Sequence, residues 1–530
     1  MLPRLFAAVR SHVFITVLVA VFLLIGIAFS VTWYRYQLNP DASSYFTIAY
    51  KYAHFNIKDA LNGYWSPLLS WLLVPAVWLH IGLSAAAKIL TIFISGIILT
   101  IVYAFLVRRG SSKTLATMVC LFLAALLLDW GMVGPITPDL LMALMILMFT
   151  LLLNSYISLP TRNKALLLGA SGALMYYAKG LGFYLFLFCL LAVVCWQWLL
   201  ARKELKKYAR LHLIALASFL VICAPFIIAV SAKYNAPTIS TAGSLDHKVF
   251  GPYYQGNLYP ELFAGPLPPP NASAVTPGED PGASFDLSKG AWSPLSSSGN
   301  FKYFMKSVVW NNGIKTLNFF KDFGVFIVLA TVITLIGCLK QTTYRREFVI
   351  FSLVGVLLCL GYCLIYTEAR YVEAAVFLAL LGAGLWLSSL QKRNLLNQAQ
   401  IIVTGLLVAG FASISTAHAI NQNRYVDRAQ SDLAASLKAD LPPGSNIISD
   451  QYSSYFVCYY LKLHCYGNIY LAGQNDDQYY QKIKDSHITY YLDYHSQDSD
   501  SRLNAFVTDY FNHLRDQAWA GGTLSIYKIN

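Results

Sequence analysis

The sequence predicts a polytopic α-helical membrane protein that ends in a small α/β domain. Hydrophobic residues make up 57% of its 530 residues and charged residues only 12%, whereas soluble globular chains average about 45–50% and about 25%. Apolar runs recur up to about residue 420, and most approach the roughly 20 residues that a bilayer core requires. Alternating helical and strand-like patterns follow. This composition excludes a water-soluble protein and a disordered chain.

The apolar runs predict about eleven transmembrane helices. The short run 165–178 joins the next run through Lys179-Gly180, where a tight hairpin is expected. The first run follows Arg4 and Arg10 and lacks a small-residue cleavage site, so we interpret it as an uncleaved anchor. The predicted spans are 12–31, 89–107, 114–130, 140–158, 165–178, 181–200, 211–230, 323–339, 348–366, 371–390 and 400–418.

The apolar run 67–87, which contains Pro75 and Trp78, decides the orientation. If this run does not cross the bilayer, the Lys/Arg-rich segments between the later spans all face the cytoplasm, as the positive-inside rule favours. We therefore expect it to lie along the outer interface as an amphipathic or re-entrant helix. The N-terminus is then cytoplasmic, and the protein is expected in a bacterial plasma membrane. Cytoplasmic loops also explain the net charge of +13, so no nucleic-acid partner is predicted.

This orientation places two large regions outside the cell. The predicted membrane domain is 1–420, with outer loops 32–88 and 232–320, and an extracytoplasmic α/β domain spans 421–530. Residues 232–320 show no hydrophobic period and are predicted to form a long loop. In the last domain we expect helices at Val426–Ala439, Tyr452–Leu461, Asp476–Lys484 and Ser501–His513, and strands at Asn446–Ser449, His464–Tyr470, Thr489–Tyr494 and Thr523–Ile529.

The chain has nine cysteines. Seven of them lie in apolar runs, where we expect them to be small buried hydrophobic residues. Cys458 and Cys465 lie instead in the polar C-terminal region. If that region is extracytoplasmic, these two can form a disulfide.

Two carboxylates and a lysine stand out near the predicted outer surface. Asp41 follows the first span, and Asp139 opens the fourth. A helix-capping role would explain either aspartate. Lys179 interrupts an apolar stretch, where a charge near a helix centre costs about 2.5–3.5 kcal/mol. A hairpin at the membrane surface is the milder explanation for this lysine.

A second polar cluster lies at the outer end of the ninth and tenth predicted spans, where Glu368, Arg370, Tyr371 and Glu373 occur together. A local ion pair is the simplest explanation. The ten histidines show no spacing typical of a transition-metal site. The two acids, the lysine and the arginine nevertheless share one predicted membrane face. This combination suits chemistry on a phospholipid-linked substrate.

Four short motifs resemble those of the C-type glycosyltransferases (the GT-C fold), and most of all the aminoarabinose transferase and protein O-mannosyltransferase group. They are Pro40-Asp41, Pro138-Asp139-Leu140-Leu141, Ala178-Lys179-Gly180 and Arg370-Tyr371. The resemblance covers residues 10–200 well and the later spans loosely. Leu181 stands where the group usually has proline, and Arg370-Tyr371 lacks the usual downstream prolines. The Trp-Trp-Asp signature of oligosaccharyltransferases is absent, which disfavours transfer of whole oligosaccharides.

The resemblance implies a polyprenyl-phosphate-linked sugar as donor and a glycolipid, polysaccharide or protein as acceptor. Asp41 is then the expected base, which takes the proton of the attacking hydroxyl in an inverting displacement. Lys179, Arg370 and Tyr371 are expected to bind the donor phosphate, and Asp139 is expected to orient the acceptor or a cation. A divalent cation, Mg or Mn, between Asp41 and Asp139 is possible, although the ligands are too few to predict a metal site.

Two other functions remain open. The number of spans and the interfacial lysine also fit a transporter or a flippase for a lipid-linked or small polar substrate. A ligase or phosphate-group transferase of the outer leaflet would share the same geometry. The sequence favours the glycosyltransferase over a transporter, because acidic residues within the spans are scarce and because transport does not require large regions outside the membrane.

Overall fold

The computed structural model describes residues 12–529 except 201, 256–264, 286–291, 341–342, 452–453, 472 and 496–500. Arg4, Arg10 and Tyr452, which the predictions used, lie outside the described residues. The chain divides into two compact units. The first unit comprises Met1–Arg35, Ala85–Ala229 and Phe301–Arg424, and the second comprises Tyr36–Ser84, Val230–Asn300 and Tyr425–Asn530.

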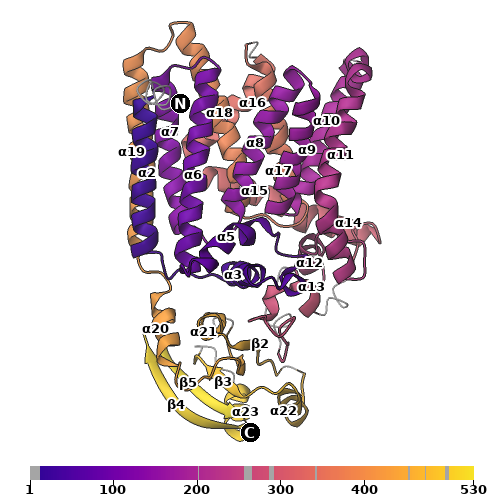
Figure 1. Cartoon of the computed structure of the whole chain (residues 1–530), viewed down its shortest axis with the longest axis vertical. Helices are drawn as coiled ribbons and strands as arrows, with labels where there is room; N and C mark the ends of the chain where they lie inside the picture. The colour runs from indigo at the N-terminus through magenta and orange to yellow at the C-terminus, as the bar shows by residue number, and fades with distance from the viewer. Residues whose placement is uncertain are drawn as a thin grey trace. The chain divides into compact units, whose positions relative to one another are not determined.

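Long apolar helices build the first unit, and all eleven predicted apolar runs are helical. Figure 1 shows α8, α9 and α10 side by side. The helices are α2 (Val13–Thr32), α6 (Leu83–Arg108), α7 (Lys113–Leu128), α8 (Asp139–Ser158), α9 (Arg162–Ala178), α10 (Leu181–Leu200), α11 (Arg202–Lys233), α16 (Val325–Lys340), α17 (Arg345–Cys363), α18 (Glu373–Lys392) and α19 (Gln398–Gln422).

The length of these helices confirms a polytopic membrane protein. Among the described residues, nine helices are long and apolar enough to cross a membrane. A tenth span results if Ser298–Asp322 and Val325–Lys340, which are bent by 115° to each other, count together. Helix α9 has only 17 residues. By length alone the number of spans is therefore nine or ten, below the predicted eleven.

The run 67–87 forms two elements rather than one, which corrects the prediction of a single interfacial helix. Helix α5 covers Leu68–Trp78, and α6 already begins at Leu83. An 11-residue helix is only about 16 Å long, about half the thickness of a bilayer core. On its own, α5 is too short to cross.

Helix α5 packs on α3 (Pro40–Ala53) in the second unit. The Ser70 hydroxyl donates to the Tyr45 carbonyl over 2.9 Å, and the rings of Tyr52 and Trp71 meet edge to face. These contacts anchor the helix that carries Asp41. The short helix α4 (Ile57–Ala60) follows α3.

The prediction of one long loop over 232–320 is wrong, because several helices form there. Lys51 forms a buried ion pair with Glu279, and Lys233 pairs with Asp280 over 2.6 Å. These ion pairs and a small hydrophobic cluster of Leu245, Val249 and Tyr254 stabilise the segment. Because both ion pairs join residues far apart in the sequence, a search for hydrophobic periods could not show them. The elements are α12 (Ala242–Val249), η3 (Pro277–Glu279), α13 (Pro281–Ser284), α14 (Ser298–Tyr303), η4 (Phe304–Trp310) and α15 (Asn311–Asp322).

The C-terminal part of the second unit is the predicted α/β fold, with a five-stranded sheet in the order β2-β1-β3-β5-β4. Strands β2, β1 and β3 are parallel, and β5 runs antiparallel to β3 and β4. The strands are β1 (Asn446–Ser449), β2 (His464–Asn468), β3 (Tyr490–Asp493), β4 (Phe511–Trp519) and β5 (Gly522–Ile529), and the helices are α20 (Arg428–Ser436), α21 (Tyr455–Leu461), α22 (Asp476–Asp485) and α23 (Ser501–Tyr510).

Strand β4 corrects the helix predicted over Ser501–His513. Helix α23 ends at Tyr510, and β4 starts at the next residue, where Phe511 pairs with Ile529 of β5. Most of β4 is exposed, so it has no buried run that would mark a strand. Its conformation depends on pairing with β5, a contact that local sequence does not encode.

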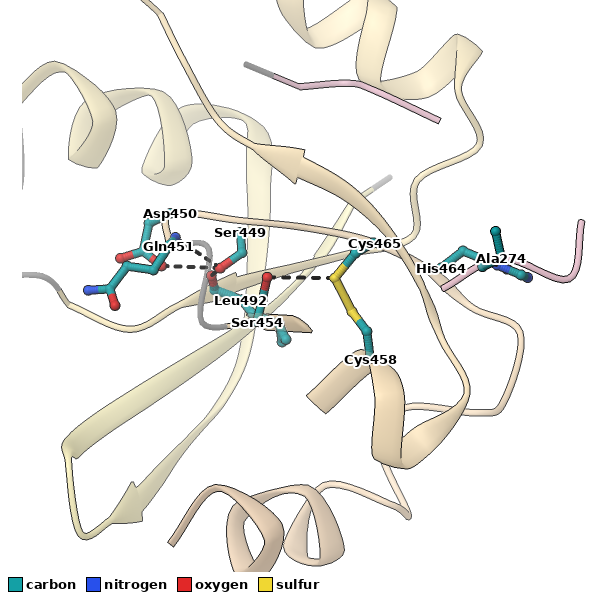
Figure 2. Close-up of a disulfide and its surroundings, with 9 residues drawn as sticks. All are labelled: Ala274, Ser449, Asp450, Gln451, Ser454, Cys458, His464, Cys465 and Leu492. Atoms are coloured by element: carbon teal, nitrogen blue, oxygen red, sulfur yellow. Dashed lines mark hydrogen bonds between the residues drawn. A yellow bond between two sulfur atoms is a disulfide. The ribbon is translucent and has the colours of Figure 1, made fainter. Parts of the chain in front are cut away.

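A disulfide joins Cys458 on α21 to Cys465 on β2 (Figure 2). The Ser454 hydroxyl lies 3.6 Å from the Cys465 sulfur. The bond closes a short loop that connects a helix to the edge strand of the sheet.

Replacing both Cys458 and Cys465 with alanine is expected to lower the free energy of unfolding of this domain by about 2 kcal/mol, because a short cross-linked loop restricts the unfolded chain. Thermal unfolding of the purified protein measures the effect. Dithiothreitol should lower the midpoint of the wild type and leave that of the double variant unchanged. Equal midpoints for wild type and variant without reductant would contradict this expectation.

Candidate active site

Asp139 is the centre of an ion-pair cluster in the first unit. It opens α8 directly after Pro138, where a carboxylate is favoured by the positive end of the helix dipole. The residue is only 5% exposed. Its Oδ1 atom accepts a hydrogen bond of 2.6 Å from the Lys179 ammonium, and its Oδ2 atom lies 3.4 Å from Nε of Arg370. Two cations converge on this carboxylate, which a simple helix-capping role does not require.

The turn between α9 and α10 holds Lys179 in place. Lys179 ends α9 in an extended conformation, and α10 begins two residues later at Leu181. The start of α10 lies so close to the end of α9 that a Cβ atom on Gly182 would approach the Met175 carbonyl carbon to 2.3 Å. A hairpin at Lys179-Gly180 was predicted, and the structure contains it although Leu181 replaces the usual proline.

Aromatic rings enclose the Lys179 ammonium opposite Asp139. Its nitrogen lies 3.5 Å from the centre of the Tyr371 ring and 5.4 Å from that of Tyr362. The two rings stack with centroids 4.5 Å apart. Cation–π attraction at such distances stabilises a partly desolvated ammonium. Tyr371 therefore belongs to the cluster through its ring.

Arg370 lies on η5 (Ala369–Val372), the short turn between α17 and α18. Its Nε atom donates to Glu368 over 2.6 Å as well as facing Asp139. The local ion pair considered for Arg370 is thus present. Arg370 also contacts Asp139, which lies more than 200 positions away in the sequence. Of the predicted site residues, the structure brings together Asp139, Lys179, Arg370 and Tyr371.

A cavity of about 300 Å³ opens beside this cluster. Its wall includes Arg370, the rings of Trp130 and Phe323, and three carboxylates, those of Asp129, Asp139 and Glu373. Asp129 begins η1 (Asp129–Val133), a π-helical turn at the end of α7; such turns occur frequently at functional sites. Glu373 was noticed in the sequence, but neither it nor Asp129 was predicted as a site residue.

Lys88 is a buried cation that the sequence reasoning missed. It is 1% exposed, and its ammonium donates to the carbonyls of Met132 over 2.8 Å and Gly134 over 2.6 Å. These carbonyls belong to the loop that connects Asp129 to Asp139, so Lys88 fixes the segment that carries both carboxylates. The available signal was a charge next to the predicted span 89–107.

Replacing Lys88 with methionine is expected to lower the free energy of unfolding by about 2 kcal/mol, because the loop carbonyls lose their buried donor. Thermal unfolding of the purified protein measures the change. The control is Lys302→Met, which removes an exposed lysine of the first unit and should leave the midpoint unchanged. Equal midpoints for Lys88→Met and wild type would show that the lysine does not hold this loop.

Asp41 belongs to the second unit, where it lies in the first turn of α3 after Pro40. It is partly buried. Lys51, near the end of the same helix, donates to Asn271 over 3.2 Å and pairs with Glu279. The assignment of Asp41 as the base stays a prediction.

Within the described part of the chain, no group of three His, Cys, Asp or Glu residues is arranged to hold a metal ion. The divalent cation considered between Asp41 and Asp139 stays an untested prediction.

No protein-family model matches the chain, and no curated protein is similar to it in sequence. Solved structures are similar to it. ArnT from Cupriavidus metallidurans in the apo state matches with a TM-score of 0.57 and 12% identity, over 98% of each chain. The chain has the fold of ArnT.

A second ArnT structure, bound to undecaprenyl phosphate, matches with a TM-score of 0.56, again at 12% identity and over 98% of each chain. Because ArnT is an aminoarabinose transferase with the GT-C fold, the predicted fold class is confirmed. The match extends over both units, including the C-terminal part, where the motif resemblance was only general.

Proposed function

We propose that the protein is a glycosyltransferase that moves one sugar from a polyprenyl-phosphate-linked donor to an acceptor on the extracytoplasmic face of the membrane. The observation that carries the proposal is the convergence of Lys179 and Arg370 on Asp139 beside a cavity, in a chain that shares its fold with ArnT. An ArnT structure contains undecaprenyl phosphate, which supports a polyprenyl-linked lipid as the donor.

The two cations suit the departure of a lipid phosphate. When the sugar leaves its phosphate, negative charge develops on the phosphate oxygens, and preorganised cations stabilise that charge most effectively. Asp139 holds both cations at fixed positions before the donor arrives. Arg370 also presents a planar set of donors that fits phosphate geometry. These two side chains are therefore the proposed phosphate-binding residues, and Tyr371 supports Lys179 through its ring.

The acceptor hydroxyl must lose a proton as it attacks the anomeric carbon, and a carboxylate within hydrogen-bond reach can take it. We assign this role to Asp41. Direct displacement of the phosphate inverts the anomeric centre. The transferred sugar is a hexosyl or pentosyl unit, and the acceptor is a glycolipid, a polysaccharide or a protein.

The disulfide supports an extracytoplasmic location for the C-terminal domain, because such bonds persist in oxidising compartments. With the C-terminus outside, an odd number of crossings places the N-terminus in the cytoplasm, the orientation that the positive-inside rule also favours. We propose this orientation in a bacterial plasma membrane.

A transfer assay tests the proposed function. The purified protein in nanodiscs is incubated with hexosyl- and pentosyl-linked undecaprenyl phosphates and with cell-envelope acceptors, and the products are analysed by mass spectrometry. The expected product carries one bare sugar, and free undecaprenyl phosphate appears with it. Lipid scrambling without a new glycosidic bond would identify a flippase instead. Transfer of the phosphate together with the sugar would identify a phosphate-group transferase.

A further inference from the structure

The carboxyl group of Glu373 is buried in the wall of the cavity and is incompletely hydrogen-bonded. Glu373 begins α18 and is 5% exposed. It lines the cavity of about 300 Å³, and its Oε2 atom is inaccessible and has no hydrogen-bond partner among the described residues. A buried acceptor without a partner is costly. Because Glu373 also lines the cavity, a ligand that donates a hydrogen bond to its carboxyl group would be favoured.

Aromatic side chains form another part of the cavity wall. Trp130 and Phe323 both line the cavity, and their ring centroids lie 5.1 Å apart. Trp130 also contacts Phe377, with centroids 5.8 Å apart, so packing on two sides restrains the indole. An apolar ring face beside a few polar groups that fix orientation is the usual composition of a small-ligand site.

The polar groups of the cavity are mainly hydrogen-bond acceptors. Three carboxylates, those of Asp129, Asp139 and Glu373, line it together with a single guanidinium, that of Arg370. A ligand with several hydroxyl groups and an apolar C–H face matches this wall. A glycosyl unit has both features.

The size of the cavity limits the ligand. Ligand pockets in proteins range from about 300 to 1,000 Å³, so a volume of about 300 Å³ suits one small ring better than an oligosaccharide. Arg370 belongs both to this wall and to the proposed phosphate-binding cluster. A sugar in the cavity would thus lie next to the cations that receive its phosphate.

We propose that this cavity binds the single glycosyl unit of the lipid-linked donor, that Glu373 accepts hydrogen bonds from its hydroxyl groups, and that Trp130 contacts its apolar face. The inference rests on the proposed function and adds two residues that recognise the sugar. Glu373 and Trp130 distinguish sugars from one another, while Lys179 and Arg370 bind the phosphate common to all such donors.

Two measurements on Glu373→Gln in the full-length protein test this assignment. The first is steady-state transfer from the donor that the wild type uses, and the second is binding of undecaprenyl phosphate, which has no sugar. We expect kcat/KM for transfer to fall roughly tenfold, as for loss of a hydrogen bond to the sugar. Binding of undecaprenyl phosphate should stay within twofold of the wild type, which also shows that the variant is folded.

Trp130→Leu provides a second variant that changes no charge, and it should likewise weaken transfer while keeping lipid-phosphate binding. The matched control is Asp322→Asn, which makes the same change from a carboxylate to an amide. This exposed aspartate ends α15 in the first unit and does not line the cavity, so the control should transfer like the wild type.

The outcomes separate the inference from the proposed function. If the wild type transfers sugar and both Glu373→Gln and Trp130→Leu transfer it with unchanged kcat/KM, the cavity is not the sugar site. Equal loss of transfer and of undecaprenyl phosphate binding in both variants would also overturn it, because the residues would then act on the phosphate or on the fold. If the wild type forms no glycosidic bond with any donor, the proposed function itself fails.

Discussion

Replacing Asp139 with alanine is expected to destabilise the first unit by about 3–5 kcal/mol and to abolish glycosyl transfer. The reason is electrostatic. Asp139 is 5% exposed and neutralises Lys179, whose ammonium is itself largely enclosed. Removing one member of a buried pair leaves an uncompensated charge, which costs far more than the pair contributed. Arg370 loses a second contact at the same time.

A double-mutant cycle measures this coupling. Thermal unfolding is followed for Asp139→Ala, Lys179→Met and the variant that carries both substitutions. The double variant lacks both charges and should be more stable than Asp139→Ala, yet it should remain inactive because the phosphate has lost a cation. If the double variant is no more stable than the sum of the two single changes predicts, the pair does not interact as the geometry indicates.

Asp41→Asn is expected to reduce transfer by about 10²–10⁴-fold, the usual contribution of a general base. Asparagine keeps the shape of the side chain in the first turn of α3 and also favours a helix N-terminus, so folding should be preserved. The thermal midpoint and the binding of undecaprenyl phosphate should match the wild type.

The matched control is Asp59→Asn, which removes another carboxylate of the second unit, one that bonds to Asn56 and Ser273. This control should transfer sugar normally. Turnover of Asp41→Asn at the wild-type rate would remove Asp41 from the base role and leave the rest of the site unchanged.

Much of the fold was predictable because a bilayer imposes a length and a composition on each span. The eleven apolar runs all became helices. The extent of 67–87 was not predictable to the residue, because both α5 and the start of α6 are apolar and the break between them has no distinct hydrophobic pattern. Strand β4 was missed for a related reason, since its partner β5 determines its conformation.

The site was partly predictable because charges in apolar sequence are rare. Asp139, Lys179 and Arg370 each stood out for this reason, and the structure joins them. Lys88 also interrupts apolar sequence, but its partners are backbone carbonyls, which no pattern reveals. In the sequence Glu373 was grouped with its charged neighbours as a local ion pair. The structure instead places it in the cavity wall, with one carboxyl oxygen that has no hydrogen-bond partner among the described residues.

Binding of undecaprenyl phosphate tests the central claim most directly, because that claim assigns the donor phosphate to Lys179 and Arg370. Native mass spectrometry or a lipid-competition assay compares the wild type with Lys179→Met, Arg370→Met and the exposed control Lys302→Met. The wild type and the control should bind alike, whereas each site variant should bind at least about tenfold more weakly, as expected for a lost charge-assisted contact. Wild-type affinity in both site variants would contradict the assignment.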